Sequence, residues 1–171
     1  VLFRSNTMNK ELSIKLLNDS IAEELHAVDQ YLYFHFHCED MGYDPLAKIF
    51  YTTAITEMRH VDMLAKRVLF LKGDVEMRRK ETVQKIHEPK EMIAHSKNLE
   101  QSAIDAYNKR VKELADNMDS ATKKLIENII VQEDGHWDDF DTEEDNFKNF
   151  GDKYLVLQAI EHSKKAGKGE E

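Results

Sequence analysis

The stretches Glu57-Met58-Arg59-His60 and Glu133-Asp134-Gly135-His136 each carry a histidine three residues after a glutamate. A second glutamate precedes each stretch by 33 residues (57 − 24 and 133 − 100), so that Glu24 and Glu100 complete the two sets. Every member of the pattern therefore repeats at an offset of 76 residues (133 − 57, 136 − 60 and 100 − 24). Residues three apart share one face of a helix, so the Glu and His of each stretch can bind the same metal ion. The repeat predicts two helical hairpins that bring four carboxylates and two imidazoles to one point.

These six residues form a donor set suited to two divalent cations. Carboxylates are hard, anionic donors that can bridge two ions, and one imidazole per ion leaves coordination positions open for oxygen. Four negative charges balance two divalent ions, whereas four carboxylates without a cation repel one another. A single Glu-x-x-His would fit an ordinary solvated helix face equally well. The second copy, the two upstream glutamates and the shared offset favour a di-metal centre.

Apolar residues at helical spacing predict four long helices. Their approximate ranges are 10–38, 44–71, 89–117 and 119–147. Residues 72–88 lack a clean periodicity and are too many for a tight turn, so we expect them to form a crossover between parallel ends of a bundle. A short fifth helix is expected at about 152–162.

The fold class that follows is all-α: a four-helix bundle with a long crossover between its second and third helices and a short C-terminal fifth helix. We expect residues 1–8 to be a disordered or artificial extension, residues 9–162 to be a single domain, and residues 163–171 to be a disordered charged tail. Neither repeats nor low-complexity segments occur beyond the twofold pattern.

The composition agrees with one helical domain and excludes several classes of protein. A length of 171 residues with 41% hydrophobic residues suits one core, and two prolines and six glycines suit long helices. The single cysteine, Cys38, excludes an intramolecular disulfide and a cysteine-rich iron centre within the chain, and fits a reducing cytoplasm. No stretch approaches the roughly 18–20 apolar residues of a membrane span. A net charge of −9 disfavours nucleic acid and suits cations. We therefore expect a cytoplasmic protein without a membrane or nucleic-acid partner.

Three motifs resemble those of the bacterioferritins, the haem-carrying branch of the ferritin-like superfamily. They are Glu24-Leu25-His26-Ala27-Val28-Asp29-Gln30-Tyr31, Glu57-Met58-Arg59-His60-Val61-Asp62 and Glu133-Asp134-Gly135-His136. The resemblance extends over nearly the whole chain, from residue 8 to about residue 161. It implies the ferritin-like form of the bundle and an intrasubunit di-iron ferroxidase centre whose ligands are Glu24, Glu57, His60, Glu100, Glu133 and His136. Within this set, Glu57 and Glu133 would bridge the two ions.

The resemblance also gives Tyr31 a catalytic role beside the metals. This residue would hydrogen-bond to a ligand or donate an electron. An amphipathic tyrosine in the core is the alternative.

Met58 distinguishes between branches of the superfamily. It lies about 100° around the helix from Glu57, so it cannot face the same metals. In the bacterioferritins, a methionine here and its symmetry mate are the axial ligands of a haem on a twofold axis, and thioether sulfur raises the potential of haem iron. The resemblance thus implies that Met58 binds haem b or a related iron porphyrin, with further contacts from Leu25, Val28, Tyr51, Ile55 and Asp62. Taken without the resemblance, Met58 would be packing at an apolar interface.

The function that the resemblance implies is iron storage and detoxification. Fe(II) would be oxidised to Fe(III) by O2 or H2O2, and the mineral would be stored in a 24-subunit shell built from twofold dimers. Haem would carry electrons inward from a small ferredoxin for iron release. Certain bacterioferritins carry a His and an Asp for an extra iron site where this chain has Thr52 and Thr56, so we expect that accessory site to be absent.

Three alternatives come from related classes. A non-haem ferritin ferroxidase is the main alternative, and Met58 distinguishes it from a haem-carrying bacterioferritin. A DNA-protecting mini-ferritin should lack Glu100, Glu133 and His136, because its ligands lie at a subunit interface. A rubrerythrin-like peroxidase usually adds a cysteine-rich iron domain.

Overall fold

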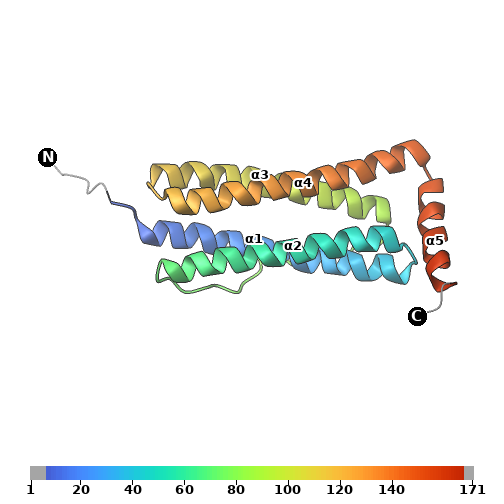
Figure 1. The fold of residues 1–171 in the computed structure, drawn as a ribbon, viewed down its shortest axis with the longest axis horizontal. Helices are drawn as coiled ribbons and strands as arrows, with labels where there is room; N and C mark the ends of the chain where they lie inside the picture. Colours follow the sequence, from blue (N-terminus) through green and yellow to red (C-terminus); the bar gives the residue numbers. More distant parts are fainter. Residues whose placement is uncertain (1–6, 168–171) are drawn as a thin grey trace.

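The computed structural model describes residues 7–167, which form five α-helices and no β-strand. The helices are α1 (Lys10–Asp40), α2 (Asp44–Phe70), α3 (Pro89–Asp116), α4 (Ser120–Phe150) and α5 (Lys153–Ala166). Helices α1 to α4 lie side by side along the bundle, and α5 crosses one end (Figure 1). The predicted all-α bundle, with its long crossover and short fifth helix, is confirmed.

Capping residues explain where the long helices begin. The side chain of Asn9 accepts a hydrogen bond from the backbone N–H of Leu12 at 3.2 Å, and Asp119 does the same for Thr122 at 3.0 Å. Pro45 lies in the first turn of α2 and Pro89 opens α3, where the missing N–H costs nothing. The predicted starts are therefore close to the observed ones.

The two ends of the described chain differ from expectation. Helix α5 continues to Ala166, four residues beyond the expected end, and so includes residues that we assigned to a disordered tail. Lys164 pairs with Glu161 at 2.5 Å and Lys165 with Asp44 at 3.1 Å, and basic residues in a last turn also suit the helix dipole. Met8, expected in a disordered extension, packs against an apolar cluster of the bundle. The remainder of both predicted segments, 1–6 and 168–171, lies outside the described residues.

The crossover runs along α1 for much of the length of the bundle, which makes α2 and α3 parallel (Figure 1). Side chains of α1 hold the crossover in place through hydrogen bonds. Asn18 donates to the carbonyl of Asp74 at 2.9 Å and accepts from the N–H of Glu76 at 3.1 Å. Gln30 donates to the carbonyl of Gln84 at 3.0 Å and accepts from its N–H at 2.7 Å. These paired bonds satisfy crossover backbone groups that helix or sheet does not pair.

Two apolar clusters fill the bundle on either side of its middle. Tyr31, Phe50 and Phe140 belong to the cluster nearer α5, and Leu17 and Leu64 belong to the other. The predicted metal ligands come between the two clusters along the helices, where they interrupt the apolar core. Within residues 7–167, no helix has an apolar stretch long enough to cross a membrane.

Candidate metal centre

All six predicted ligands come together in the middle of the bundle. Helix α1 supplies Glu24, α2 supplies Glu57 and His60, α3 supplies Glu100, and α4 supplies Glu133 and His136. Each of these residues is at most 9% exposed. Their donor atoms form two overlapping groups of four, and within each group all atoms lie within 4.8 Å of one another.

The first group surrounds His60. Its Nδ1 lies 2.8 Å from Oε2 of Glu57, 3.0 Å from Oε1 of Glu133 and 3.5 Å from Oε2 of Glu24. The other ring nitrogen, Nε2, faces Oε1 of Gln132 at 3.3 Å. A donor bond from Nε2 to that amide oxygen would leave the lone pair of Nδ1 free for a metal ion.

The second group surrounds His136 and mirrors the first. Its Nδ1 lies 3.0 Å from Oε1 of Glu57, 3.3 Å from Oε2 of Glu133 and 3.7 Å from Oε2 of Glu100. Glu57 and Glu133 therefore give one oxygen to each half of the site, as bridging carboxylates do. Glu24 and Glu100 each serve only one half, as terminal ligands do.

Unpaired polar atoms test whether this donor set fits metal ions. Across the part of the chain that the structure describes, the buried side-chain atoms without a hydrogen-bond partner are Glu57 Oε1 and Oε2, His60 Nδ1, Glu133 Oε1 and His95 Nε2. Four of these five belong to the candidate centre. Short distances join them to one another, but none of the four has a hydrogen-bond partner. Each such orphan costs about 1–3 kcal/mol, which two cations would offset. The residues fit a pair of divalent ions that prefer oxygen and imidazole donors.

Burial and mutual repulsion set the protonation of the terminal glutamates. The pKa of Glu24 is raised well above its ordinary value by burial and by the nearby charges of Glu133 and Glu57. The pKa of Glu100 is raised well above its ordinary value by burial and by Glu57. Both carboxyl groups therefore keep a proton to a higher pH than an ordinary glutamate does.

The same carboxylates also raise the pKa values of the two histidines. Burial acts to lower the pKa of His60, but close contact with Glu133, Glu24 and Glu57 outweighs it and raises the pKa to about 12. The pKa of His136 is also raised, because nearby carboxylates outweigh its burial. Burial acts to raise the pKa of Glu133, but the two histidines lower it to about 2. Protons thus supply the positive charge that balances the buried carboxylates.

Two tyrosines support the terminal glutamates. Tyr31 donates a hydrogen bond to Glu100, and Tyr107 donates one to Glu24, and both phenols are fully buried. Our sequence prediction included Tyr31 but not Tyr107. The missed signal was the common offset, since Tyr107 follows Tyr31 by 76 residues (107 − 31).

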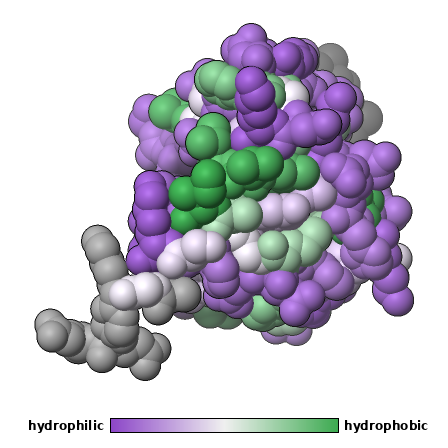
Figure 2. All heavy atoms as spheres, turned by 90° about the vertical axis from the view of Figure 1, so that its right-hand side faces the viewer, coloured by the Kyte–Doolittle hydropathy of each residue, from purple (hydrophilic) through white to green (hydrophobic). Residues whose placement is uncertain are grey.

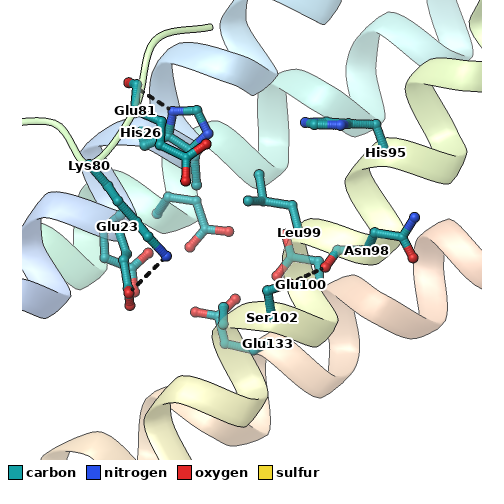
Figure 3. A pocket seen from close by; sticks show the side chains of 14 residues that line it. Glu23, His26, Lys80, Glu81, His95, Asn98, Leu99, Glu100, Ser102 and Glu133 are labelled. Carbon is teal, nitrogen blue, oxygen red and sulfur yellow. Dashed lines mark hydrogen bonds and ion pairs between the residues drawn. The ribbon is translucent and has the colours of Figure 1, made fainter. Parts of the chain in front are cut away.

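A cavity of about 220 Å³ connects the centre with the outer face of the bundle beside the crossover. Its buried wall includes the four ligand glutamates, and its exposed wall includes Lys80 and Glu81 of the crossover. Lys80 pairs with Glu23 at 3.2 Å, and His26 donates to the carbonyl of Glu81 at 3.1 Å (Figure 3). The crossover therefore borders an opening through which ions could reach the carboxylates.

The residues predicted to contact haem divide into two groups. Met58 and Tyr51 are each 45% exposed, Ile55 is half-buried, and Asp62 is exposed and pairs with Lys66 at 2.6 Å. Met58 thus lies on the surface of α2, away from the buried centre.

Leu25 and Val28 are only 8% and 6% exposed and offer little surface to a ligand between subunits. Leu25 is part of the same apolar cluster as Leu64, which explains its burial. The hydroxyls of Thr52 and Thr56 donate to carbonyls of their own helix.

Comparison with known proteins agrees with this geometry. Residues 14–150 match the family model of the ferritin-like domain. The chain is 32% identical over 143 residues to the bacterioferritin of Desulfovibrio desulfuricans, which covers 84% of this chain and 80% of that one. It is 31% identical over 148 residues to the bacterioferritin of Brucella melitensis biotype 1, which covers 85% and 91% of the two chains.

Solved structures give the same result. The X-ray structure of the Desulfovibrio desulfuricans bacterioferritin, which concerns its diiron site in different catalytic states, matches with a TM-score of 0.86 and 32% identity over 88% of each chain. The Rhodobacter capsulatus bacterioferritin, with a metal-free dinuclear site and haem iron in a crystallographic special position, matches with a TM-score of 0.85 and 27% identity over 90% and 96% of the chains. Fold and site thus define a ferritin-like carboxylate bundle. Within that class, the chain belongs to the bacterioferritin family.

Proposed function

We propose that this protein stores iron and oxidises Fe(II) to Fe(III) at the centre formed by Glu24, Glu57, His60, Glu100, Glu133 and His136. One observation carries the proposal: Glu57 and Glu133 each direct their two oxygens toward different histidines. Such an arrangement suits two ions held side by side. The diiron site of the Desulfovibrio desulfuricans relative supports iron as the metal.

The reaction balances with two Fe(II) ions as substrates. Each ion gives up one electron, and the two electrons reduce O2 with two protons to H2O2, or reduce H2O2 with two protons to two waters. The four carboxylates favour the higher charge of the Fe(III) product, because hard anionic donors prefer hard cations. The cavity beside the crossover offers the Fe(II) ions a route to these carboxylates, and the net charge of −9 attracts them.

Haem and assembly complete the proposal. Met58 and its mate on a twofold axis would hold haem b or a related porphyrin, which when bound supplies electron transfer for the reduction of stored Fe(III). Support comes from the exposure of Met58 and Tyr51 and from the haem iron of the Rhodobacter capsulatus relative. A small ferredoxin as reductant and a cytoplasmic location belong to the same proposal.

Exposed apolar residues support assembly with further copies, which we propose to form a 24-subunit shell. Figure 2 views the end of the bundle that α5 crosses and shows a hydrophobic patch there. Val156, Leu157 and Ile160 of α5 are 57%, 53% and 44% exposed. Patches of this kind commonly mark contacts between proteins.

Replacement of a terminal ligand tests the proposed oxidation. Glu100→Ala should slow rapid Fe(II) oxidation by at least about a hundredfold, since even the loss of outer partners of metal ligands costs roughly 10–100-fold. Glu91→Ala is the matched control, because Glu91 is an exposed glutamate on the same helix. Stopped-flow absorbance after mixing with O2 measures the rate, and circular dichroism checks the helices. A Glu100→Ala protein that oxidises Fe(II) as fast as the control would refute the assignment.

A further inference from the structure

The two terminal glutamates each have one oxygen occupied by a tyrosine. Tyr107 donates to Oε1 of Glu24, and Tyr31 donates to Oε1 of Glu100. The second oxygen of each glutamate, Oε2, faces the histidine of the same half of the site. Each terminal carboxylate therefore presents one oxygen to its metal position.

Both phenols are held firmly in place. Tyr31 packs against Phe50 and Phe140, with ring centroids 6.4 and 5.5 Å away. The guanidinium of Arg110 lies 5.4 Å from the centre of the Tyr107 ring and is itself fixed by an ion pair with Glu23 at 2.6 Å. Hydrogen bonds from such buried donors to a carboxylate are among the stronger ones, so they can decide which way the carboxylate turns.

The number of donors shows why this orientation matters. Each half of the site offers four protein atoms: one oxygen from a terminal glutamate, one from each bridging glutamate and one imidazole nitrogen. An ion held only by these four atoms keeps further coordination positions open. If a terminal glutamate bound through both of its oxygens, one of these positions would be filled.

We propose that Tyr107, together with Tyr31, is a positioning residue that restricts Glu24 and Glu100 to coordination through a single oxygen. This keeps a coordination position open on each ion for the oxidant. The inference rests on the proposed di-metal function and adds to it a role for Tyr107 and a reason for the pairing of the two phenols. When the phenol of the tyrosine is removed, the freed oxygen of the terminal glutamate lies in a buried site beside the ion and turns toward the ion.

Co(II) provides a test that does not depend on oxidation activity. Its visible absorption weakens as its coordination number rises, so the intensity reports how many donors each ion has. The variants are Tyr107→Phe, Tyr31→Phe and the double variant. Tyr154→Phe is the matched control, because Tyr154 is only 4% exposed and also donates to a glutamate, Glu143, outside the centre. Co(II) is titrated into each protein, and bound ions per chain are counted.

The expected result separates the two halves of the site. The unmodified protein and Tyr154→Phe should bind two Co(II) per chain with the same intense spectrum. Tyr107→Phe and Tyr31→Phe should still bind two, with a severalfold loss of intensity at one of them, and the double variant should show this loss at both. If Tyr107→Phe loses helical content, Tyr31→Phe carries the same test for the other ion.

Three outcomes would overturn the inference. Single variants with the spectrum of the control would show that the phenols do not limit coordination. A variant that binds only one Co(II) would show that its tyrosine is needed for binding itself. Fewer than two Co(II) bound to the unmodified protein would remove the proposed centre, and this failure is distinguishable because it occurs before any substitution.

Discussion

At the scale of single residues, protonation explains how four carboxylates can share a buried site. The groups whose pKa is raised, and which therefore hold a proton more readily, are the two terminal glutamates and the two histidines: Glu24, Glu100, His60 and His136. Positive charge on the imidazoles then offsets part of the negative charge of the carboxylates. Two divalent ions with four carboxylates and neutral imidazoles are neutral in total. Metal binding therefore exchanges protons for cations without burying net charge.

This exchange predicts proton release. Binding of two Zn(II) per chain at neutral pH should release protons, because groups whose pKa is raised must lose their protons to become ligands. The affinity should fall as the pH falls, since the raised pKa values let protons compete more strongly. Titration in a weakly buffered solution with a pH indicator measures the release. Fewer than about one proton per chain would contradict the assigned protonation.

Residue types determined how much of the site was predictable from the sequence. The six candidate ligands were predicted because metal chemistry needs particular side chains at fixed helical spacing, and the common offset joined the two halves. Tyr107 was missed because a tyrosine suits an apolar helix face as well as a bond to a carboxylate. The contacts between Gln30 and Gln84 could not be predicted, since bonds from side chains to an irregular backbone leave no periodic pattern.

At the scale of helices and loops, caps and breaks set the boundaries. Proline and glycine allowed the ends of the long helices to be predicted closely, whereas the end of α5 depends on a tertiary ion pair between Lys165 and Asp44. Asp119 takes part both in a helix cap and in a contact with another helix. Besides capping α4 through Thr122, it accepts a hydrogen bond from Arg67 of α2 at 3.0 Å. One buried carboxylate thus fixes the start of α4 and its position beside α2.

Removal of this carboxylate should destabilise the bundle. Asp119→Ala should lower the free energy of unfolding by about 2 kcal/mol through the lost cap and the lost bond to Arg67. The thermal midpoint should fall by roughly 4–8 °C in circular dichroism. Asp138→Ala, at an exposed position of α4, is the control and should shift it little.

The same carboxylate has a predicted pH dependence. Burial acts to raise the pKa of Asp119, but hydrogen bonds from Thr122 and Ser13 and the charge of Arg67 lower it. Its stabilisation is therefore present above roughly pH 4, the ordinary value for the unfolded chain, and is lost as the pH falls through the lowered pKa. A difference between Asp119→Ala and the unmodified protein that grew below pH 4 would contradict this role.

At the scale of the whole molecule, exposed apolar surface lies on α2 and on α5. Met58 and Tyr51 form the first surface and are exposed, whereas Glu57 on the same helix is buried in the centre. The second surface covers the end of the bundle (Figure 2). A twofold contact through α2 would bring two copies of Met58 together, and contacts through α5 would join further dimers.

The haem proposal predicts a spectroscopic result. Purified protein, reduced after expression with adequate haem, should show the sharp bands of two thioether ligands at about one haem per two chains, as a twofold site requires. Met58→Leu should lose these bands yet oxidise Fe(II) within about twofold of the normal rate, since Met58 faces away from the centre. Met77→Leu, which replaces an exposed methionine of the crossover, should keep them. Absence of haem in the unmodified protein would favour a non-haem ferritin ferroxidase.

The most direct measurement of the central claim is the number of Fe(II) ions oxidised per chain in the first rapid phase. Anaerobic protein is loaded with increasing Fe(II) and mixed with O2 in a stopped-flow spectrometer, and the amplitude of the fast absorbance change is recorded. With two ions held by six ligands, the amplitude should saturate at about two Fe(II) per chain. Saturation at one Fe(II), or a steady rise without a break, would contradict the di-iron centre.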